Sequence, residues 1–172
     1  GEVGINEETL EDGYKWASSI VRGFLQRAPQ YLSQSNSDDG EEIEPYPSPR
    51  SWHILVLALS GLRAANLGLD FVTVVAEGCL GKGVAEAFVN FIRSANLPPI
   101  KEILGDYSVT PNNPDALFVL LYALPQAIST LEEMEAGWKW IIWLERERGV
   151  DYAVVGAKEM KKITESKFGV EG

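Results

Sequence analysis

The apolar residues of this chain recur at helical spacing over almost its whole length, and no convincing run alternates as a β-strand does. One apolar stripe is made of Leu10, Tyr14, Ala17, Val21, Phe24 and Ala28. Another is made of Val84, Phe88, Phe91, Ile92 and Ala95. Residues 70–80 fit a shorter helix, although their β-branched run leaves a strand open as an alternative. The pattern therefore predicts an all-α fold, a bundle of about six to eight helices with no sheet.

Local signals divide the chain into three segments. Residues 1–47 are expected to hold a connecting helix, ended or kinked at Pro29, and an acidic linker that is too polar to bury and therefore mobile. Residues 48–125 are expected to form a helical domain. Residues 126–172 are expected to form a helical extension at the C-terminus.

Residues 48–52, Ser-Pro-Arg-Ser-Trp, place a cation where helix electrostatics disfavour one. Ser48 is a preferred N-cap residue and Pro49 suits the first helical position, so a helix is expected to begin here. The run 54–59 is almost wholly apolar, which predicts that this helix is buried on most sides. Arg50 then lies beside free backbone N–H groups, an arrangement that favours an anion shared between them. The alternative is an arginine that pairs with a nearby glutamate or lies in solvent.

A resemblance to a known family supports the first interpretation. Residues 47–52, Pro-Ser-Pro-Arg-Ser-Trp, resemble the motif that opens the sensor 2 helix in the lid of MoxR-type AAA+ ATPases. Residues 83–91 are similar to the next helix of such a lid. Residues 24–25 and 29–32 resemble the segment that joins the ATPase core to the lid. The resemblance covers residues 15–125, so it implies that the middle segment is a lid.

The resemblance also implies a function. In that family the sensor 2 arginine reaches the γ-phosphate of ATP bound by the core domain, which implies the same role for Arg50, with Ser48 and Ser51 next to the nucleotide. The implied cofactor is ATP, with Mg²⁺ supplied through a core domain outside this chain, and no tight binding to this piece alone. The implied partners are the protein's own N-terminal ATPase core, other copies in a homo-oligomeric ring, and a client protein that is remodelled or assembled.

The chain does not contain the rest of an ATPase. The pair Gly81-Lys82 does not complete a P-loop, because Ala76 stands where the first glycine is needed and Gly83 replaces the hydroxyl residue that binds magnesium. These glycines are better explained as a turn between helices. No apolar strand ends in paired acidic residues. We therefore expect a C-terminal fragment of a larger ATPase, which does not hydrolyse ATP alone.

Three tryptophans, Trp138, Trp140 and Trp143, lie close together in the last segment. Aromatic residues at helical spacing are usually core residues. The alternative is an aromatic patch that contacts a partner, with the charged residues 145–148 at its rim. The competing function is therefore a free-standing helical interaction module without nucleotide, docking through these tryptophans or through the apolar residues 116–124. A viral or phage structural protein is a third interpretation.

Composition and a few single residues argue against several further classes of partner and site. A formal net charge of −10 argues against a nucleic-acid partner, because affinity for duplexes comes mainly from neutralising phosphates. Cys79 is the only cysteine, so a disulfide within the chain and a cysteine-based metal site are excluded, and no metal is expected. His53 has no evident nucleophile to activate. The chain shows no signal peptide and no long apolar run, so we expect no contact with a membrane and a cytoplasmic location.

Overall fold

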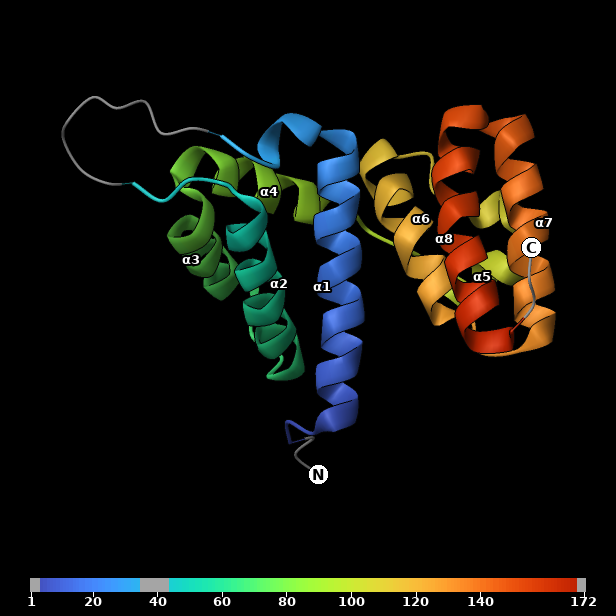
Figure 1. Cartoon of the computed structure of the whole chain (residues 1–172), viewed down its shortest axis with the longest axis horizontal. Coiled ribbons are helices and arrows are strands. Elements are labelled where there is room, and N and C mark those ends of the chain that lie inside the picture. Colours follow the sequence, from blue (N-terminus) through green and yellow to red (C-terminus); the bar gives the residue numbers. More distant parts are fainter. Residues whose placement is uncertain (1–3, 35–43, 170–172) are drawn as a thin grey trace. The chain divides into compact units, whose positions relative to one another are not determined.

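A computed structural model describes residues 4–34 and 44–169 of the chain. Over those residues it is helical and contains no strand, which confirms the all-α prediction (Figure 1). The α-helices are α1 (Glu7–Arg27), α2 (Pro49–Ala64), α3 (Leu69–Leu80), α4 (Lys82–Ser94), α5 (Ile100–Gly105), α6 (Pro114–Ala127), α7 (Leu131–Glu147) and α8 (Val150–Phe168). The 3₁₀ helices are η1 (Pro29–Tyr31) and η2 (Tyr107–Val109). In these ranges no helix has both the length and the apolar character needed to cross a bilayer.

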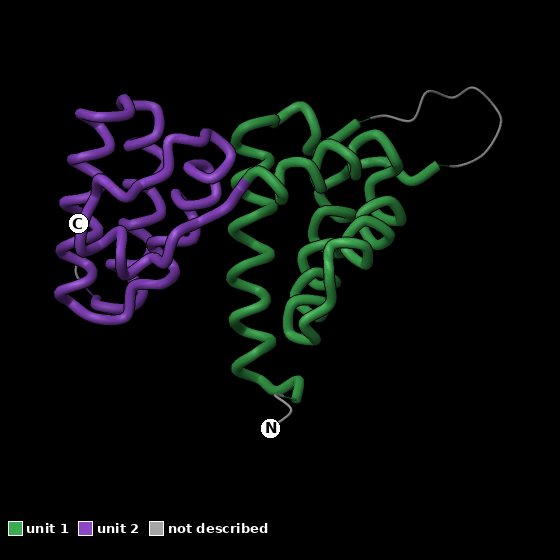
Figure 2. The backbone as a smooth tube through the Cα atoms, turned by 180° about the vertical axis from the view of Figure 1, so that it is seen from behind, with its two compact units in different colours: residues 1–94 green, residues 95–172 purple. Residues whose placement is uncertain are grey.

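The chain forms two compact units, residues 1–94 and residues 95–172 (Figure 2). Unit 1 contains α1 to α4, and unit 2 contains α5 to α8. The boundary therefore lies between α4 and α5, whereas the sequence signals place boundaries after residues 47 and 125. No boundary separates α1 from α2, because these two helices pack together. The boundary precedes α6 because that helix packs against α8 and so shares a core with the helices that follow it.

Of the acidic linker that the sequence predicts over residues 33–47, residues 35–43 lie outside the described residues. The described Pro47 is buried, and its carbonyl oxygen accepts a hydrogen bond from the N–H of Gln34 at 3.0 Å.

Aromatic side chains join three helices of unit 1 into one core. The Phe24 ring of α1 lies 5.6 Å from the Trp52 ring of α2, measured between centroids. The same ring lies 5.4 Å from those of Phe88 and Phe91 on α4. All four side chains are buried, and such ring pairs stabilise a core beyond the area that they bury.

Residues 69–80 form the helix α3, so the strand alternative is wrong. Val72, Ala76 and Leu80 recur every four residues and are all buried, because a helix brings them to one side. The helix stops at Gly81, whose φ of +80° lies in the region that favours glycine. Gly81 therefore marks a turn between helices, as the sequence predicts.

The core of unit 2 surrounds α6. The buried residues of this helix are Ala116, Leu117, Val119, Leu120, Leu121, Tyr122, Leu124 and Pro125. Two glycines allow α7 and α8 to approach closely. A Cβ on Gly137 would lie 2.8 Å from Cε of Met160, and a Cβ on Gly156 would lie 2.7 Å from Cδ1 of Ile141. Larger residues at these glycines would force the helices apart or displace their neighbours.

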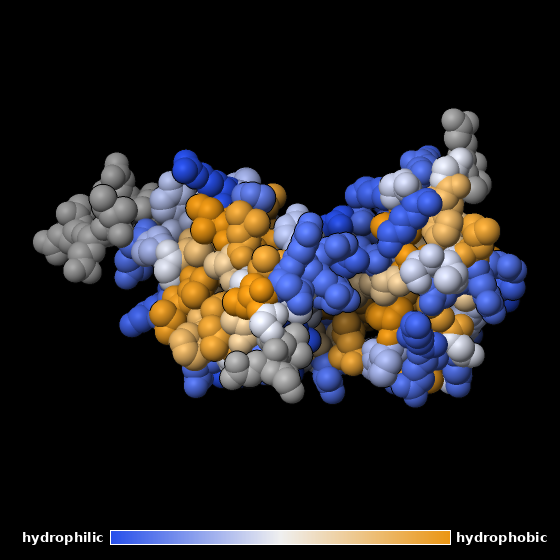
Figure 3. Space-filling model, turned by 90° about the horizontal axis from the view of Figure 1, so that it is seen from below, coloured by the Kyte–Doolittle hydropathy of each residue, from blue (hydrophilic) through white to orange (hydrophobic). Residues whose placement is uncertain are grey.

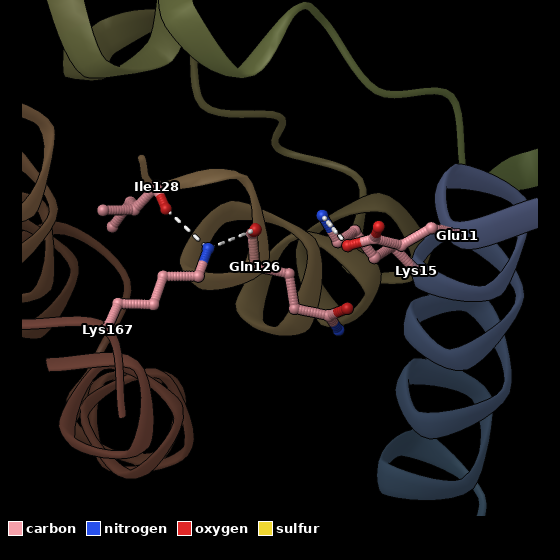
Figure 4. Close-up of polar contacts among 5 residues, drawn as sticks. All are labelled: Glu11, Lys15, Gln126, Ile128 and Lys167. Atoms are coloured by element: carbon pink, nitrogen blue, oxygen red, sulfur yellow. Dashed lines mark hydrogen bonds and ion pairs between the residues drawn. The ribbon is translucent and has the colours of Figure 1, made fainter. Parts of the chain in front are cut away.

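A lysine of α8 holds the end of α6 (Figure 4). The ammonium group of Lys167 donates hydrogen bonds to the carbonyl oxygens of Ile128 at 2.7 Å and Gln126 at 3.2 Å. The last carbonyl groups of a helix have no partner within it, and a cation there also complements the macrodipole. Lys167 thus fixes the end of α6, which runs past Pro125 to Ala127.

Candidate functional site

The helix α2 begins where the sequence predicts, through two reciprocal serine contacts. The backbone N–H of Ser51 donates to Oγ of Ser48 at 3.1 Å, and the N–H of Ser48 donates to Oγ of Ser51 at 2.7 Å. Pro49 has no N–H, so the N–H of Arg50 is the one backbone donor of this turn without a partner among the described residues. The two serines therefore cap the helix. This leaves one free N–H and one guanidinium, fewer donors than the sequence suggests.

Trp52 anchors this start of α2 in the core. Its side chain is 3% exposed, and its indole N–H donates to the carbonyl oxygen of Tyr31 at 2.8 Å. The ring also lies 5.5 Å from that of Phe88. Residues two apart lie on opposite sides of a helix, so burial of Trp52 directs Arg50 outward. The motif therefore places a buried anchor and an exposed cation on the same helical turn.

Arg50 is exposed and forms no ion pair or side-chain hydrogen bond with any described residue. It lies at the edge of an open hollow of about 320 Å³. The hollow is lined by Glu44, Pro45, Tyr46, Ser48, Arg50, Ser51, Ile54 and Cys79. Although Glu44 shares this lining, it does not pair with the arginine. Over the described residues Arg50 does not pair with a glutamate, and its exposed side chain fits the other half of the alternative, an arginine that lies in solvent.

Gly81 shapes the wall of this hollow. A Cβ at this residue would lie 2.5 Å from the carbonyl oxygen of Pro45, so only glycine lets the chain pass so close. The backbone N–H of Gln34 donates to the carbonyl oxygen of Pro47 at 3.0 Å. These contacts hold the segment that leads into α2.

Among the described residues, the titratable side chains that line the hollow are those of Glu44, Tyr46, Arg50 and Cys79. Burial raises the pKa of the Cys79 thiol, which reduces its thiolate fraction at neutral pH. His53 is exposed and has no hydrogen-bond partner among those residues. Nowhere in the described ranges do three histidine, cysteine or carboxylate side chains gather as metal ligands would. The polar and charged side chains that line the hollow are those of Glu44, Tyr46, Ser48, Arg50 and Ser51.

The three tryptophans of α7 point to different neighbours. Trp140 is fully buried, and its indole N–H donates to Oγ1 of Thr110 at 3.1 Å. Trp138 donates to Oγ1 of Thr164 at 3.1 Å. The Trp143 ring lies 5.4 Å from the guanidinium carbon of Arg148. They therefore form no common surface patch, and the arrangement matches the interpretation of these tryptophans as core residues.

Sequence reasoning missed an apolar surface on unit 1. The exposed fractions are 47% for Ile54 and 53% for Leu57 on α2, and 55% for Phe71 and 69% for Val74 on α3. We call these four residues the α2–α3 face. Figure 3 shows apolar residues gathered on the surface of unit 1 when it is seen from below. The prediction that α2 is buried on most sides is therefore wrong, because the run 54–59 includes outward-facing positions. The signal in the sequence was apolar spacing of three residues on both helices.

The comparisons with known proteins do not identify the chain. No family model matches its sequence, and neither a curated protein nor a solved structure is significantly similar to it. The features of this chain that bear on function are its own residues, chiefly Arg50 and the α2–α3 face.

Proposed function

We propose that this chain is the helical lid of a MoxR-type AAA+ ATPase, in which Arg50 contacts the γ-phosphate of ATP bound by a core domain outside the chain. The observation that carries the proposal is the exposed Arg50 side chain, unpaired among the described residues, on a helix start held by a buried tryptophan. The positive end of the macrodipole repels a guanidinium, and an anion shared by both relieves that repulsion.

The proposed role needs nothing from this chain beyond binding and position. A guanidinium binds phosphate oxygens in a fork geometry and stabilises the negative charge that they carry during transfer. Trp52 fixes the start of α2 to the core of unit 1. A displacement of Arg50 would therefore move the whole unit. Nucleotide state would thereby set the orientation of the lid. The full proposal places the protein in a cytoplasmic ring that acts on a client protein, with Mg²⁺ held through the core.

The proposal is tested by the turnover of ATP in the intact ATPase. We expect Arg50→Ala to lower turnover about a hundredfold, the usual effect of removing one donor to transition-state charge. Arg63→Ala is the matched control, because Arg63 lies near the other end of the same helix, 5.0 Å from the Trp16 ring centroid. The control should leave turnover unchanged. Equal turnover in Arg50→Ala and the unmodified enzyme, with α-helical content retained, would remove Arg50 from the nucleotide site.

A second candidate function is a helical interaction module that needs no nucleotide. The observation that favours it is the exposed α2–α3 face. The surfaces that the sequence suggests for docking are less suitable, since Trp140 is fully buried and most of the run 116–124 is core. Binding that persists after Arg50→Ala and is lost after Leu57→Glu would support this function.

A further inference from the structure

Unit 1 carries a further hollow, whose charged side chains are of both signs. Its volume is about 240 Å³, and it is lined by residues of α3 and α4. Glu77 and Glu86 contribute two carboxylates, and Lys82 and Arg93 contribute two cations. It shares no lining residue with the hollow beside Arg50. We call it the α3–α4 hollow.

The four charged side chains of the α3–α4 hollow form no ion pair with a described residue. Opposite charges four residues apart do pair in α1, α7 and α8. Lys82 and Glu86 have the same spacing in α4, yet they do not pair. Nη1 of Arg93 lies 3.5 Å from Oδ1 of Asn90, which is longer than a usual hydrogen bond. All four charged groups are therefore available to a ligand.

The two signs restrict which ligand fits the α3–α4 hollow. A simple anion would meet the two carboxylates as well as the two cations, and a simple cation would meet the same mixture. An uncharged ligand would take water from charged groups without replacing its hydrogen bonds. The four charges sum to zero, so the matching ligand has one charged group of each sign and no net charge.

We propose that the α3–α4 hollow binds a free amino acid. The ammonium group of the amino acid would donate hydrogen bonds to the carboxylates of Glu77 and Glu86, which come from different helices. Its carboxylate would accept hydrogen bonds from Arg93, because a guanidinium matches a carboxylate in fork geometry. The side-chain amide of Asn90, beside Arg93, has an NH2 group that can donate to the same carboxylate.

The hollow also limits the size and the affinity of the ligand. Its volume of about 240 Å³ is below the range of about 300–1,000 Å³ that is usual for drug-sized ligands. Val89, which is 3% exposed, lines it and offers an apolar contact to a short aliphatic side chain. Lys82, Glu86 and Arg93 are exposed, so water competes for their hydrogen bonds and the affinity is low. The inference does not depend on the proposed nucleotide role, because Arg50 takes no part in it.

An NMR titration of the full chain with L-alanine tests the inference, with sodium chloride as the blank. We expect saturable shifts at the amides of α3 and α4, with a Kd of about 1–10 mM, the range of weak complexes. Ethylammonium and propionate are the matched probes, because each keeps one charged group of L-alanine and lacks the other. Each should bind at least about tenfold more weakly, since it leaves charged groups of the hollow without a partner.

Substitutions of the lining residues test the contacts. Glu86→Gln and Arg93→Gln should each weaken the binding of L-alanine at least about tenfold, because each removes one charged partner. Arg146→Gln, at an exposed residue of α7 in unit 2, is the matched control and should bind L-alanine as the unmodified chain does. Circular dichroism of each variant checks that the helices remain formed. Three results would overturn the inference: no saturable shift at α3 and α4, an equal affinity for either single-charge probe, or an unchanged affinity in either lining variant.

Discussion

The helices α2 and α6 start alike and lie in different surroundings. Ser48-Pro49 and Asn113-Pro114 each combine a capping side chain with a proline in the first turn, and a long apolar run follows both. Five residues of α2 are buried, against eight in the shorter α6. After the proline, α6 has Asp115, which suits the positive helix end, whereas α2 has Arg50, which does not.

This difference indicates that α6 belongs to the core of its own unit, whereas the features of α2 suit contacts outside its unit. In α6 the apolar residues are enclosed, and the charge in the first turn is the favourable one. In α2 an outer apolar stripe stays in water, and the first turn carries an unfavourable cation. Neither feature stabilises unit 1 by itself. Both are explained if α2 meets a partner, whether an anion at Arg50 or another chain on the α2–α3 face.

The largest expected effect comes from matched leucine truncations in the two helices. Leu120 of α6 is fully buried and Leu57 of α2 is 53% exposed. Leu120→Ala should lower the free energy of unfolding of its unit by about 2–5 kcal/mol, because it leaves a cavity. Leu57→Ala should change it by less than about 0.5 kcal/mol. Urea denaturation followed by circular dichroism, at a concentration where the chain is monomeric, checks both. Similar losses would mean that α2 is enclosed to the same degree as α6.

A smaller effect is expected from exchanging the charges after the two prolines. Arg50→Asp should raise the free energy of unfolding by about 0.3–1 kcal/mol at low ionic strength, because an acid suits the positive helix end. Asp115→Arg should lower it by at least a similar amount. Thermal denaturation at low and high salt measures both, since screening weakens the effect. A loss of stability in Arg50→Asp would show that the arginine has an internal partner, and the comparison between the helices would fail.

The smallest expected effect is a dependence of helix stability on pH, which the start of α7 has and the start of α2 lacks. The backbone N–H and hydroxyl groups of Ser129 donate to Glu133 at 2.8 and 2.9 Å and, together with the Thr130 N–H, lower the pKa of its carboxyl. A lowered pKa means stabilisation that is complete above the ordinary value of 4.5 and is lost as the pH falls through the folded-state value.

The first turn of α2 has Ser51 in the equivalent position, which does not titrate in this range. Amide hydrogen exchange between pH 5 and pH 3 should therefore show a loss of protection at the start of α7 that Glu133→Gln abolishes, with no matching loss at the start of α2. Equal losses at both helix starts would show that the capping carboxylate is not the cause.

Local signals predicted the helices well because capping is decided by neighbouring residues. The start of α2 at Pro49 and the turn at Gly81 depend on side chains within a few positions. The unit boundary was not predictable in this way, since it depends on the packing of α6 against α8. The sequence left a helix and a strand open for residues 70–80, because their β-branched side chains also suit a strand. The structure shows a helix, in which residues four positions apart are buried.

The candidate site was predictable in part. The exposure of Arg50 follows from the burial of Trp52 two residues later, which the sequence only hints at. The sequence predicted Ser48 as the N-cap, and the structure adds the reciprocal contact from Ser51, which is available within one turn. A nucleotide next to these serines stays a prediction. The α2–α3 face was missed because an apolar run does not reveal which of its residues meet the core. That depends on how α1 and α3 pack against α2, which the residues of the run do not determine.

The most direct test of the central claim, that Arg50 is free to bind an anion from outside the chain, is an NMR titration of the chain with inorganic pyrophosphate. The account predicts shifts at the amides of Arg50 and Ser51 and at the Arg50 side chain. Those shifts should persist in Arg63→Ala and disappear in Arg50→Ala. Amide shifts of the same size in Arg50→Ala, or no response at this helix start, would contradict it.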